Sequence, residues 1–179
     1  MILTLVLVLN NQMDDFATPC EPDYFGVPPA KSNYIAPGKI PLSSMSPTMV
    51  LASVNNSTSL GHLVMVLGAS GGPKIITAVL NVVLNYFYRG LPLWDSVVAP
   101  RVHNQLIYHG SPKTAVENSV VGRVGIRVSD RTRNALQSRG QALLDVDYTG
   151  TVQAAAVDIE TDRLTAVSDI RKGGAPDGY

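Results

Sequence analysis

A glycine-rich segment at residues 68–73 (Gly-Ala-Ser-Gly-Gly-Pro) lies directly after a predicted strand and before a predicted helix. Backbone N–H groups point outward at the start of a helix, where the macrodipole favours negative charge. Such a turn can hold a phosphate, a carboxylate or a developing oxyanion. Its spacing matches neither a Walker A loop, nor Gly-x-Gly-x-x-Gly, nor the Gly-x-Ser-x-Gly nucleophile elbow. A tight strand-to-helix turn without a ligand is the competing interpretation.

Two earlier segments carry further groups that can bind a small polar molecule. Residues 10–16 (Asn-Asn-Gln-Met-Asp-Asp-Phe) contain paired acids, which can hold an ammonium group or a cation. Residues 41–48 contain Ser43, Ser44 and Ser46, whose hydroxyls can donate to a carboxylate. A solvated turn and a polar loop are the alternatives. The chain thus offers groups that bind and polarise a substrate, but no convincing pair of nucleophile and base.

Metal and disulfide chemistry are not indicated by the sequence. The three histidines, His62, His103 and His109, are scattered and lack metal-ligand spacing with any neighbouring acid or cysteine. We predict that each is an ordinary core or surface residue. The single cysteine, Cys20, excludes an internal disulfide framework and a cysteine-rich zinc site.

Composition limits the class of protein. The 179 residues include 14 Lys and Arg against 14 Asp and Glu, a balance that argues against a nucleic-acid binder and a polybasic membrane patch. Charged residues make up only 16% and apolar residues 45%, so part of the apolar surface is expected to face a partner chain. Length predicts one domain over residues 1–179. No apolar run reaches the roughly 20 residues of a membrane span.

The elements that position these groups follow from periodicity and turn residues. Met1–Leu9 is predicted as a buried strand rather than a signal peptide, because it lacks a basic start and a small-residue cleavage site. Residues 17–47 hold most of the prolines and are predicted as an ordered loop. The other predicted strands are Met49–Val54, His62–Leu67, Val102–Tyr108, Thr151–Ile159 and Leu164–Ile170, and the predicted helices are Lys74–Tyr88, Leu93–Ala99 and 129–138. This order favours layered antiparallel sheets with helices outside them.

Taken together, the motifs resemble the small subunit of γ-glutamyltranspeptidase. They occur in the family's order over almost the whole chain, at residues 9–16, 37–39, 41–48, 68–72, 99–105 and 168–179. The resemblance implies an α+β fold: part of the α-β-β-α sandwich of an N-terminal-nucleophile hydrolase, missing its first strands and the large subunit. It also implies transfer of a γ-glutamyl group from glutathione or another γ-glutamyl compound to water, an amino acid or a peptide, without a metal or organic cofactor.

The resemblance assigns donor-binding roles to four side chains. Asp15 would bind the α-amino group of the glutamyl donor through a charge-assisted contact, and Gln12 would help. Ser43 and Ser44 would hydrogen-bond the α-carboxylate of the donor. The arginine that pairs with this carboxylate in the family belongs to the large subunit.

The resemblance also assigns the oxyanion hole, to the backbone N–H groups of Gly71 and Gly72, with Gly72 touching the substrate as well. The family's nucleophile is a threonine a few dozen residues before the residue 10–16 motif, so we expect this chain to lack it and to be inactive alone. The expected partner is the large subunit of the same precursor.

Two alternative functions remain open, and the resemblance also predicts a cellular location. One alternative is a non-enzymatic light-chain-like protein that binds a partner or a γ-glutamyl ligand. The other is a structural subunit that completes a separately encoded nucleophile chain. The resemblance implies an extracellular, secretory or vacuolar location for the full-length protein, without membrane contact by this segment. We also expect exposed strand edges and apolar surface on the isolated chain.

Overall fold

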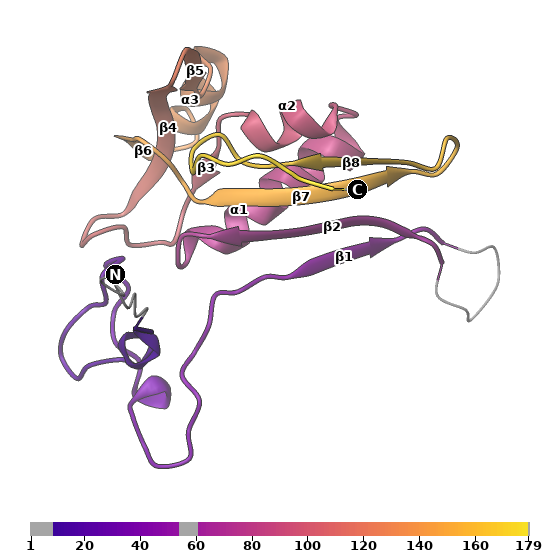
Figure 1. The fold of residues 1–179 in the computed structure, drawn as a ribbon. Helices are drawn as coiled ribbons and strands as arrows, with labels where there is room; N and C mark the ends of the chain where they lie inside the picture. Colours follow the sequence, from indigo (N-terminus) through magenta and orange to yellow (C-terminus); the bar gives the residue numbers. More distant parts are fainter. Residues whose placement is uncertain (1–8, 54–60, 179) are drawn as a thin grey trace, which may run out of the picture. The chain divides into compact units, whose positions relative to one another are not determined.

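The computed structural model describes residues 9–53 and 61–178 (Figure 1). The predicted strand Met1–Leu9 lies outside the described residues, except for Leu9. The chain divides into two compact units, Met1–Ser43 and Ser44–Tyr179. Their positions relative to one another are not determined, so the expectation of one domain over residues 1–179 stays a prediction.

The first unit contains most of the proline-rich loop that the sequence predicts at residues 17–47, whose last four residues belong to the second unit. Its described residues hold two short 3-10 helices, η1 (Gln12–Asp15) and η2 (Lys31–Asn33), with irregular chain around them. A single parallel bridge joins Ala17 to Tyr34. Backbone hydrogen bonds in turns, together with side-chain contacts, therefore connect the described residues of this unit.

The second unit is built on an antiparallel sheet with the strand order β1-β2-β7-β8. Its strands are β1 (Thr48–Leu51), β2 (Leu63–Ser70), β7 (Thr151–Asp158) and β8 (Arg163–Val167). The two predicted hairpins are thereby confirmed. One detail differs, because β2 continues to Ser70, where it pairs with Thr151 of β7. The turn into the helix therefore begins at Gly71 rather than at Gly68.

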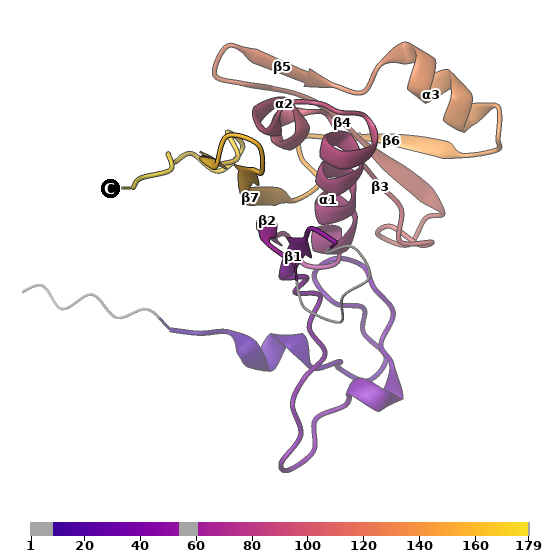
Figure 2. The same cartoon turned by 90° about the vertical axis from the view of Figure 1, so that its right-hand side faces the viewer.

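Helices α1 (Lys74–Val83) and α2 (Leu93–Val98) cover one face of this sheet (Figure 2). The apolar spacing that predicted a helix over residues 74–88 is confirmed, although its last turn is the π-helix η3 (Leu84–Tyr88). Pro73 precedes the first helical residue, where its missing N–H costs nothing. Met65, Leu67, Val79, Val82, Val97, Val152 and Val167 are buried members of the core between helices and sheet.

A second sheet was largely missed by the sequence analysis. It comprises β3 (Val102–His103), β4 (Lys113–Val121), β5 (Val124–Arg127) and β6 (Ala142–Val146), with α3 (Asp130–Gln137) between the last two. The predicted strand Val102–Tyr108 is wrong beyond His103, because Leu106 has a φ of 68°. The expectation of purely antiparallel sheets is also wrong, since β4 and β6 pair in parallel. The predicted cap of α3 is confirmed, as the Ser129 hydroxyl accepts from the Thr132 N–H.

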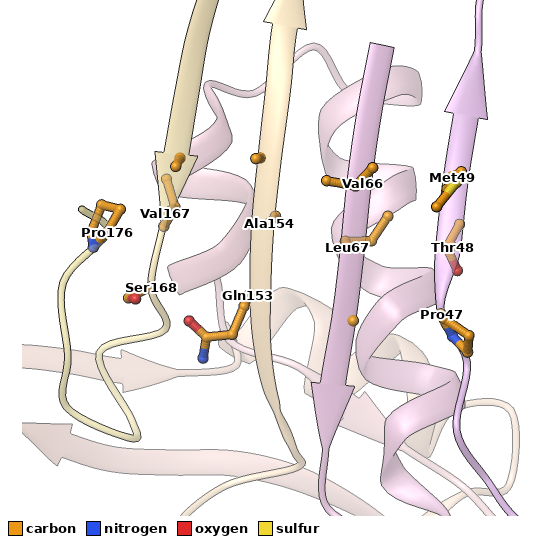
Figure 3. Close-up of a pocket in the computed structure, with 13 residues that line it drawn as sticks. Pro47, Thr48, Met49, Val66, Leu67, Gln153, Ala154, Val167, Ser168 and Pro176 are labelled. Atoms are coloured by element: carbon orange, nitrogen blue, oxygen red, sulfur yellow. The ribbon is translucent and has the colours of Figure 1, made fainter. Parts of the chain in front are cut away.

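The face of the first sheet opposite its helices is apolar too. Met49, Val66, Ala155 and Ala166 pair in register across the four strands and point to this face. A cavity of about 720 Å³ lies over it, between Pro47 and Met49 at one edge and Ser168 and Pro176 at the other (Figure 3). A sheet that is apolar on both faces is built to be covered on both, which suits one β layer of an α-β-β-α sandwich.

Two methionines on neighbouring strands test which face is the core. Met65 of β2 is 1% exposed and Met49 of β1 is 76% exposed. We expect Met65→Ala to lower the free energy of unfolding by about 2–5 kcal/mol, because it leaves a cavity. Met49→Ala is the matched control and should change it by about 0.5 kcal/mol or less. Urea unfolding of both variants measures the difference; equal effects would contradict this assignment of the core.

Candidate functional site

The glycine turn presents two unused backbone donors. Gly71 and Gly72 have φ values of 136° and 60°, which side-chain-bearing residues rarely adopt. Their carbonyls accept from the N–H groups of Lys74 and Ile75 and so start helix α1. Within the described residues, the N–H groups of the two glycines donate no hydrogen bond. Free donors at a helix start favour a bound anion or oxyanion.

Two lysines bring positive charge to this turn. The Lys172 ammonium donates to Ser70 Oγ at 3.0 Å, and Ser70 Oγ in turn lies 2.8 Å from Thr151 Oγ1. The Lys74 ammonium lies 4.9 Å from the centre of the Tyr148 ring, a cation–π contact. Both cations add to the helix dipole, so the electrostatics of the turn favour negative charge.

Next to the turn lies a buried network of four charged side chains. Arg101 donates to Asp169 at 2.8 Å, and Arg171 donates to Asp169 at 3.0 Å and to Glu117 at 2.6 Å. The four side chains are at most 2% exposed. Two cations balance two anions, as burial of charge requires. The network joins the end of β8 to β4 and to the chain after α2.

Backbone groups complete the coordination of the network. Glu117 accepts from the N–H groups of Arg101 and Thr149 at 2.9 and 2.8 Å. Asp169 accepts from the N–H of Val152 at 2.9 Å. Arg171 donates to the carbonyls of residues 97–99 at the end of α2. Nearly every polar atom is thereby satisfied, except Arg101 Nε among the described residues.

Burial and charge act in opposite directions on these groups. Burial pushes the pKa of Asp169 up, but the Arg101 charge, the Val152 N–H and the Arg171 charge outweigh it and hold that pKa below its ordinary value. The pKa of Arg101 is lowered, chiefly by burial and then by repulsion from Arg171, with Asp169 opposing the shift. The carboxylate of Asp169 is therefore ionised in the folded chain.

In the first unit, one asparagine side chain links the two predicted donor-binding segments. Asn33 Nδ2 donates to the carbonyl of Asp15 at 2.7 Å, and its Oδ1 accepts from the N–H of Leu42 at 2.9 Å. It thus holds η1 beside the residue that precedes Ser43. The Lys39 ammonium binds the carbonyl of Tyr34 at 2.9 Å and that of Ser32. Sequence reasoning noted Lys39 only within a motif and missed Asn33.

The six predicted site residues fall into both units. Gln12, Asp15 and Ser43 are exposed residues of the first unit. The Asn33 side chain connects the segment of Asp15 to the segment of Ser43. Ser44 is a half-buried residue of the second unit, as are the two glycines of the turn. The roles assigned to these residues stay predictions.

The histidines occupy core and surface positions, as predicted. His62 and His109 are exposed, and His103 is buried with Nδ1 2.8 Å from Thr77 Oγ1 and Nε2 2.8 Å from Gln105 Oε1. Burial lowers the pKa of His103; the hydrogen bond to Gln105 opposes this shift and the Lys74 charge adds to it. Residues 9–53 and 61–178 contain no cluster of three or more His, Cys, Asp or Glu that suits a metal ion.

The model of the gamma-glutamyltranspeptidase family matches residues 6–179. The chain belongs to this family. Glutathione hydrolase 2 of Arabidopsis thaliana is 40% identical over 185 residues, which cover 97% of this chain but only 30% of the relative. Gamma-glutamyltranspeptidase from Pseudomonas nitroreducens, solved in complex with L-DON, is 30% identical with a TM-score of 0.76, covering 99% of this chain and 84% of that chain.

Two further relatives add to the picture of the gamma-glutamyltranspeptidase family. The relative in Schizosaccharomyces pombe is named a glutathione hydrolase proenzyme, which indicates processing of a precursor. Glutathione hydrolase 4 of Arabidopsis thaliana, whose name describes it as thought inactive, is 46% identical over 103 residues, covering 56% of this chain and 50% of the relative. In the described part of this family member, no helix is long and apolar enough to cross a bilayer.

The Asn33 link generates a prediction for the first unit. Replacing Asn33 by alanine removes both hydrogen bonds, so the amide of Leu42 should exchange with solvent at least about tenfold faster, the effect of losing roughly 1.4 kcal/mol. Hydrogen exchange of the 179-residue chain measures it. Asn134→Ala, at an exposed position of α3, is the control and should leave this amide unchanged. Equal exchange in both variants would refute the link.

The buried network generates a second prediction, with a defined sign in pH. Asp169→Asn leaves two arginines short of a counter-charge and should lower the free energy of unfolding at pH 7 by about 3–5 kcal/mol. Because the folded pKa of Asp169 is depressed, its stabilisation is present above the ordinary carboxyl range and is lost as pH falls through it toward the folded pKa. The variant should therefore show a shallower loss of stability below about pH 5.

Urea unfolding at several pH values measures both parts of this prediction. Asp162→Asn, at an exposed position of the β7–β8 turn, is the control and should change the free energy of unfolding at pH 7 by about 0.5 kcal/mol or less. An Asp169→Asn variant as stable as this control at pH 7 would show that the network contributes nothing.

Proposed function

We propose that this chain is the C-terminal part of the small subunit of a γ-glutamyltransferase/glutathione hydrolase. It would supply part of the glutamyl-binding pocket and the oxyanion hole for γ-glutamyl transfer from glutathione to water, amino acids or peptides. The observation that carries the proposal is the pair of free N–H groups at Gly71 and Gly72, flanked by Lys172 and Lys74, in a member of this family.

The chemistry assigned to the turn is stabilisation of negative charge. When a nucleophilic hydroxyl attacks the γ-carbonyl carbon, the C=O electron pair moves to oxygen and an oxyanion forms. Two N–H donors at a helix start stabilise that charge more than they stabilise the neutral carbonyl. Collapse of the intermediate expels the amine with a proton and leaves a γ-glutamyl ester, which water or an acceptor amine then cleaves. The hydroxyl would come from a threonine of the family's precursor outside residues 9–178.

The segments at residues 12–15 and 43–44 would recognise the glutamyl donor. The Asp15 carboxylate suits its α-ammonium group, with Gln12 as an additional polar contact, and the Ser43 and Ser44 hydroxyls suit its α-carboxylate. Asn33 supports this proposal, because it fixes the backbone of the acid-bearing η1 beside the serine segment.

The proposed partner is the large subunit of the same precursor. Apart from the open face of the first sheet, helix α1 and η3 carry an apolar outer stripe: Ile76, Leu80 and Leu84 are 56%, 51% and 47% exposed. A helix that is apolar nearly all round is normally covered. The chain spans 30% of the length of glutathione hydrolase 2, so such relatives possess ample chain to cover both surfaces.

Release of p-nitroaniline from γ-glutamyl-p-nitroanilide tests the proposed function. We expect no activity from the 179-residue chain and full activity from a protein extended upstream by the large subunit and the threonine-bearing segment of the family. In the extended protein, Asp15→Asn should raise KM at least about tenfold through loss of an ionic contact, equivalent to about 1.4 kcal/mol. Asp95→Asn, on the exposed surface of α2, is the control and should leave KM unchanged.

A second function is favoured by the relative named as thought inactive. In that case the chain is a non-enzymatic light-chain-like protein that binds a partner or a γ-glutamyl ligand. Two results together would favour this second function. The extended protein would show no activity in the same assay, and calorimetry would detect glutamate binding that Asp15→Asn abolishes. Activity of the 179-residue chain alone would contradict both.

A further inference from the structure

Gly71 of the glycine turn and Gly150, 79 positions later in the sequence, lie in close backbone contact. A methyl group added to Gly71 would lie 2.9 Å from the Cα of Gly150, closer than side-chain Cβ atoms approach backbone. A methyl group added to Gly150 would lie 3.2 Å from Ala78 Cβ, 3.3 Å from the Ser70 carbonyl oxygen and 3.4 Å from the Lys74 carbonyl oxygen. Gly150 therefore fills the corner between the end of β2, the turn and the first turns of α1.

The buried network fixes Gly150 in that corner. Arg101 Nη1 donates to the carbonyl oxygen of Gly150 at 2.8 Å. Glu117 holds the N–H of Thr149, directly before the glycine, and Asp169 holds the N–H of Val152, two residues after it. The backbone on both sides of Gly150 is thus tied to carboxylates that are themselves buried and paired.

We propose that Gly150 is a positioning residue for the oxyanion hole: it transmits the rigidity of the buried network to the Gly71–Gly72 turn and sets the direction of the two free N–H groups. The proposal rests on the proposed function of that turn. Because hydrogen bonds weaken steeply when donors are misaligned, a small displacement of the turn would reduce stabilisation of the oxyanion while leaving donor binding intact.

A matched pair of glycine variants tests the positioning role. Gly150 and Gly140 have nearly equal φ values, 87° and 83°, so alanine is equally strained at both positions. Around Gly140 no atom lies within 4 Å of an added methyl group, whereas at Gly150 the methyl group meets both ends of the turn. A difference between Gly150→Ala and Gly140→Ala therefore reports the close approach and not the backbone strain.

The first readout is kinetic and uses the extended two-subunit enzyme with γ-glutamyl-p-nitroanilide. We expect Gly150→Ala to lower kcat at least about tenfold with KM within about twofold, because the oxyanion exists only in the transition state. Gly140→Ala should keep both constants within about twofold of the parent. A kcat for Gly150→Ala equal to that of Gly140→Ala overturns the proposal.

The second readout does not depend on activity. Hydrogen exchange of the Lys74 and Ile75 amides, which donate to the carbonyls of Gly71 and Gly72, should be faster in Gly150→Ala than in Gly140→Ala in the 179-residue chain. Equal exchange in both variants overturns the positioning role even if the parent enzyme is inactive. If Gly150→Ala folds poorly, Gly150→Ala with Ala78→Gly removes the nearest contact. This double variant should recover folding and part of kcat; recovery of neither also overturns the proposal.

Discussion

The ion-pair network of Arg101, Glu117, Asp169 and Arg171 is the constraint on which the second unit depends. Its four members come from three segments: Arg101 follows α2, Glu117 lies in β4, and Asp169 and Arg171 both follow β8. Because these three segments adjoin helix α2, the second sheet and the first sheet, the network is where the two sheets and the helical layer meet. The C-terminal segment is held at Asp169 and Arg171 because buried partners compensate their charges.

The desolvation penalty of its buried charges makes this network cooperative. A buried ion that loses its partner faces a desolvation penalty of several kcal/mol, so removing one member harms the rest. The network is therefore stable only when all three segments are in place together. Because Arg101 and the two carboxylates also bind the backbone around Gly150, that cooperative requirement extends to the glycine turn. Stability of the second unit and the direction of the Gly71 and Gly72 N–H groups thus share one cause.

The sequence predicted the features that depend on neighbouring residues and missed those that depend on partners far apart in the chain. The β1–β2 and β7–β8 hairpins, helix α1 and the Ser129 cap depend on residues close together in the chain, so periodicity and turn chemistry were sufficient. Strand β4 was missed because Glu117, a buried acid, interrupts its apolar run, and acids are almost never buried without a partner. The partners, Arg101 and Arg171, lie 16 and 54 positions away, a separation that no local pattern reveals.

The candidate site shows a similar division. The glycine turn was predictable, because strand, glycines, Pro73 and helix follow one another directly. The link through Asn33 was not, because it joins side chain to backbone across 18 and 9 positions. The role of Gly150 was hidden for another reason: its importance lies in a missing Cβ, and a glycine that avoids a collision is indistinguishable in sequence from one that terminates a helix, as Gly140 does.

The low charge of the chain has its explanation in the same architecture. Four of its charged side chains are buried in the network, so the surface carries fewer charged residues than the 16% of the composition indicates. The sheet is apolar on both faces and α1 is apolar nearly all round, which leaves two surfaces that water covers poorly. Buried charged side chains and exposed apolar surfaces are both expected of a layer that lies inside a larger assembly. The glycine turn lies at the end of that layer, where a partner that covers the sheet would also exclude water from the two N–H groups and so strengthen them in the oxyanion role proposed for them.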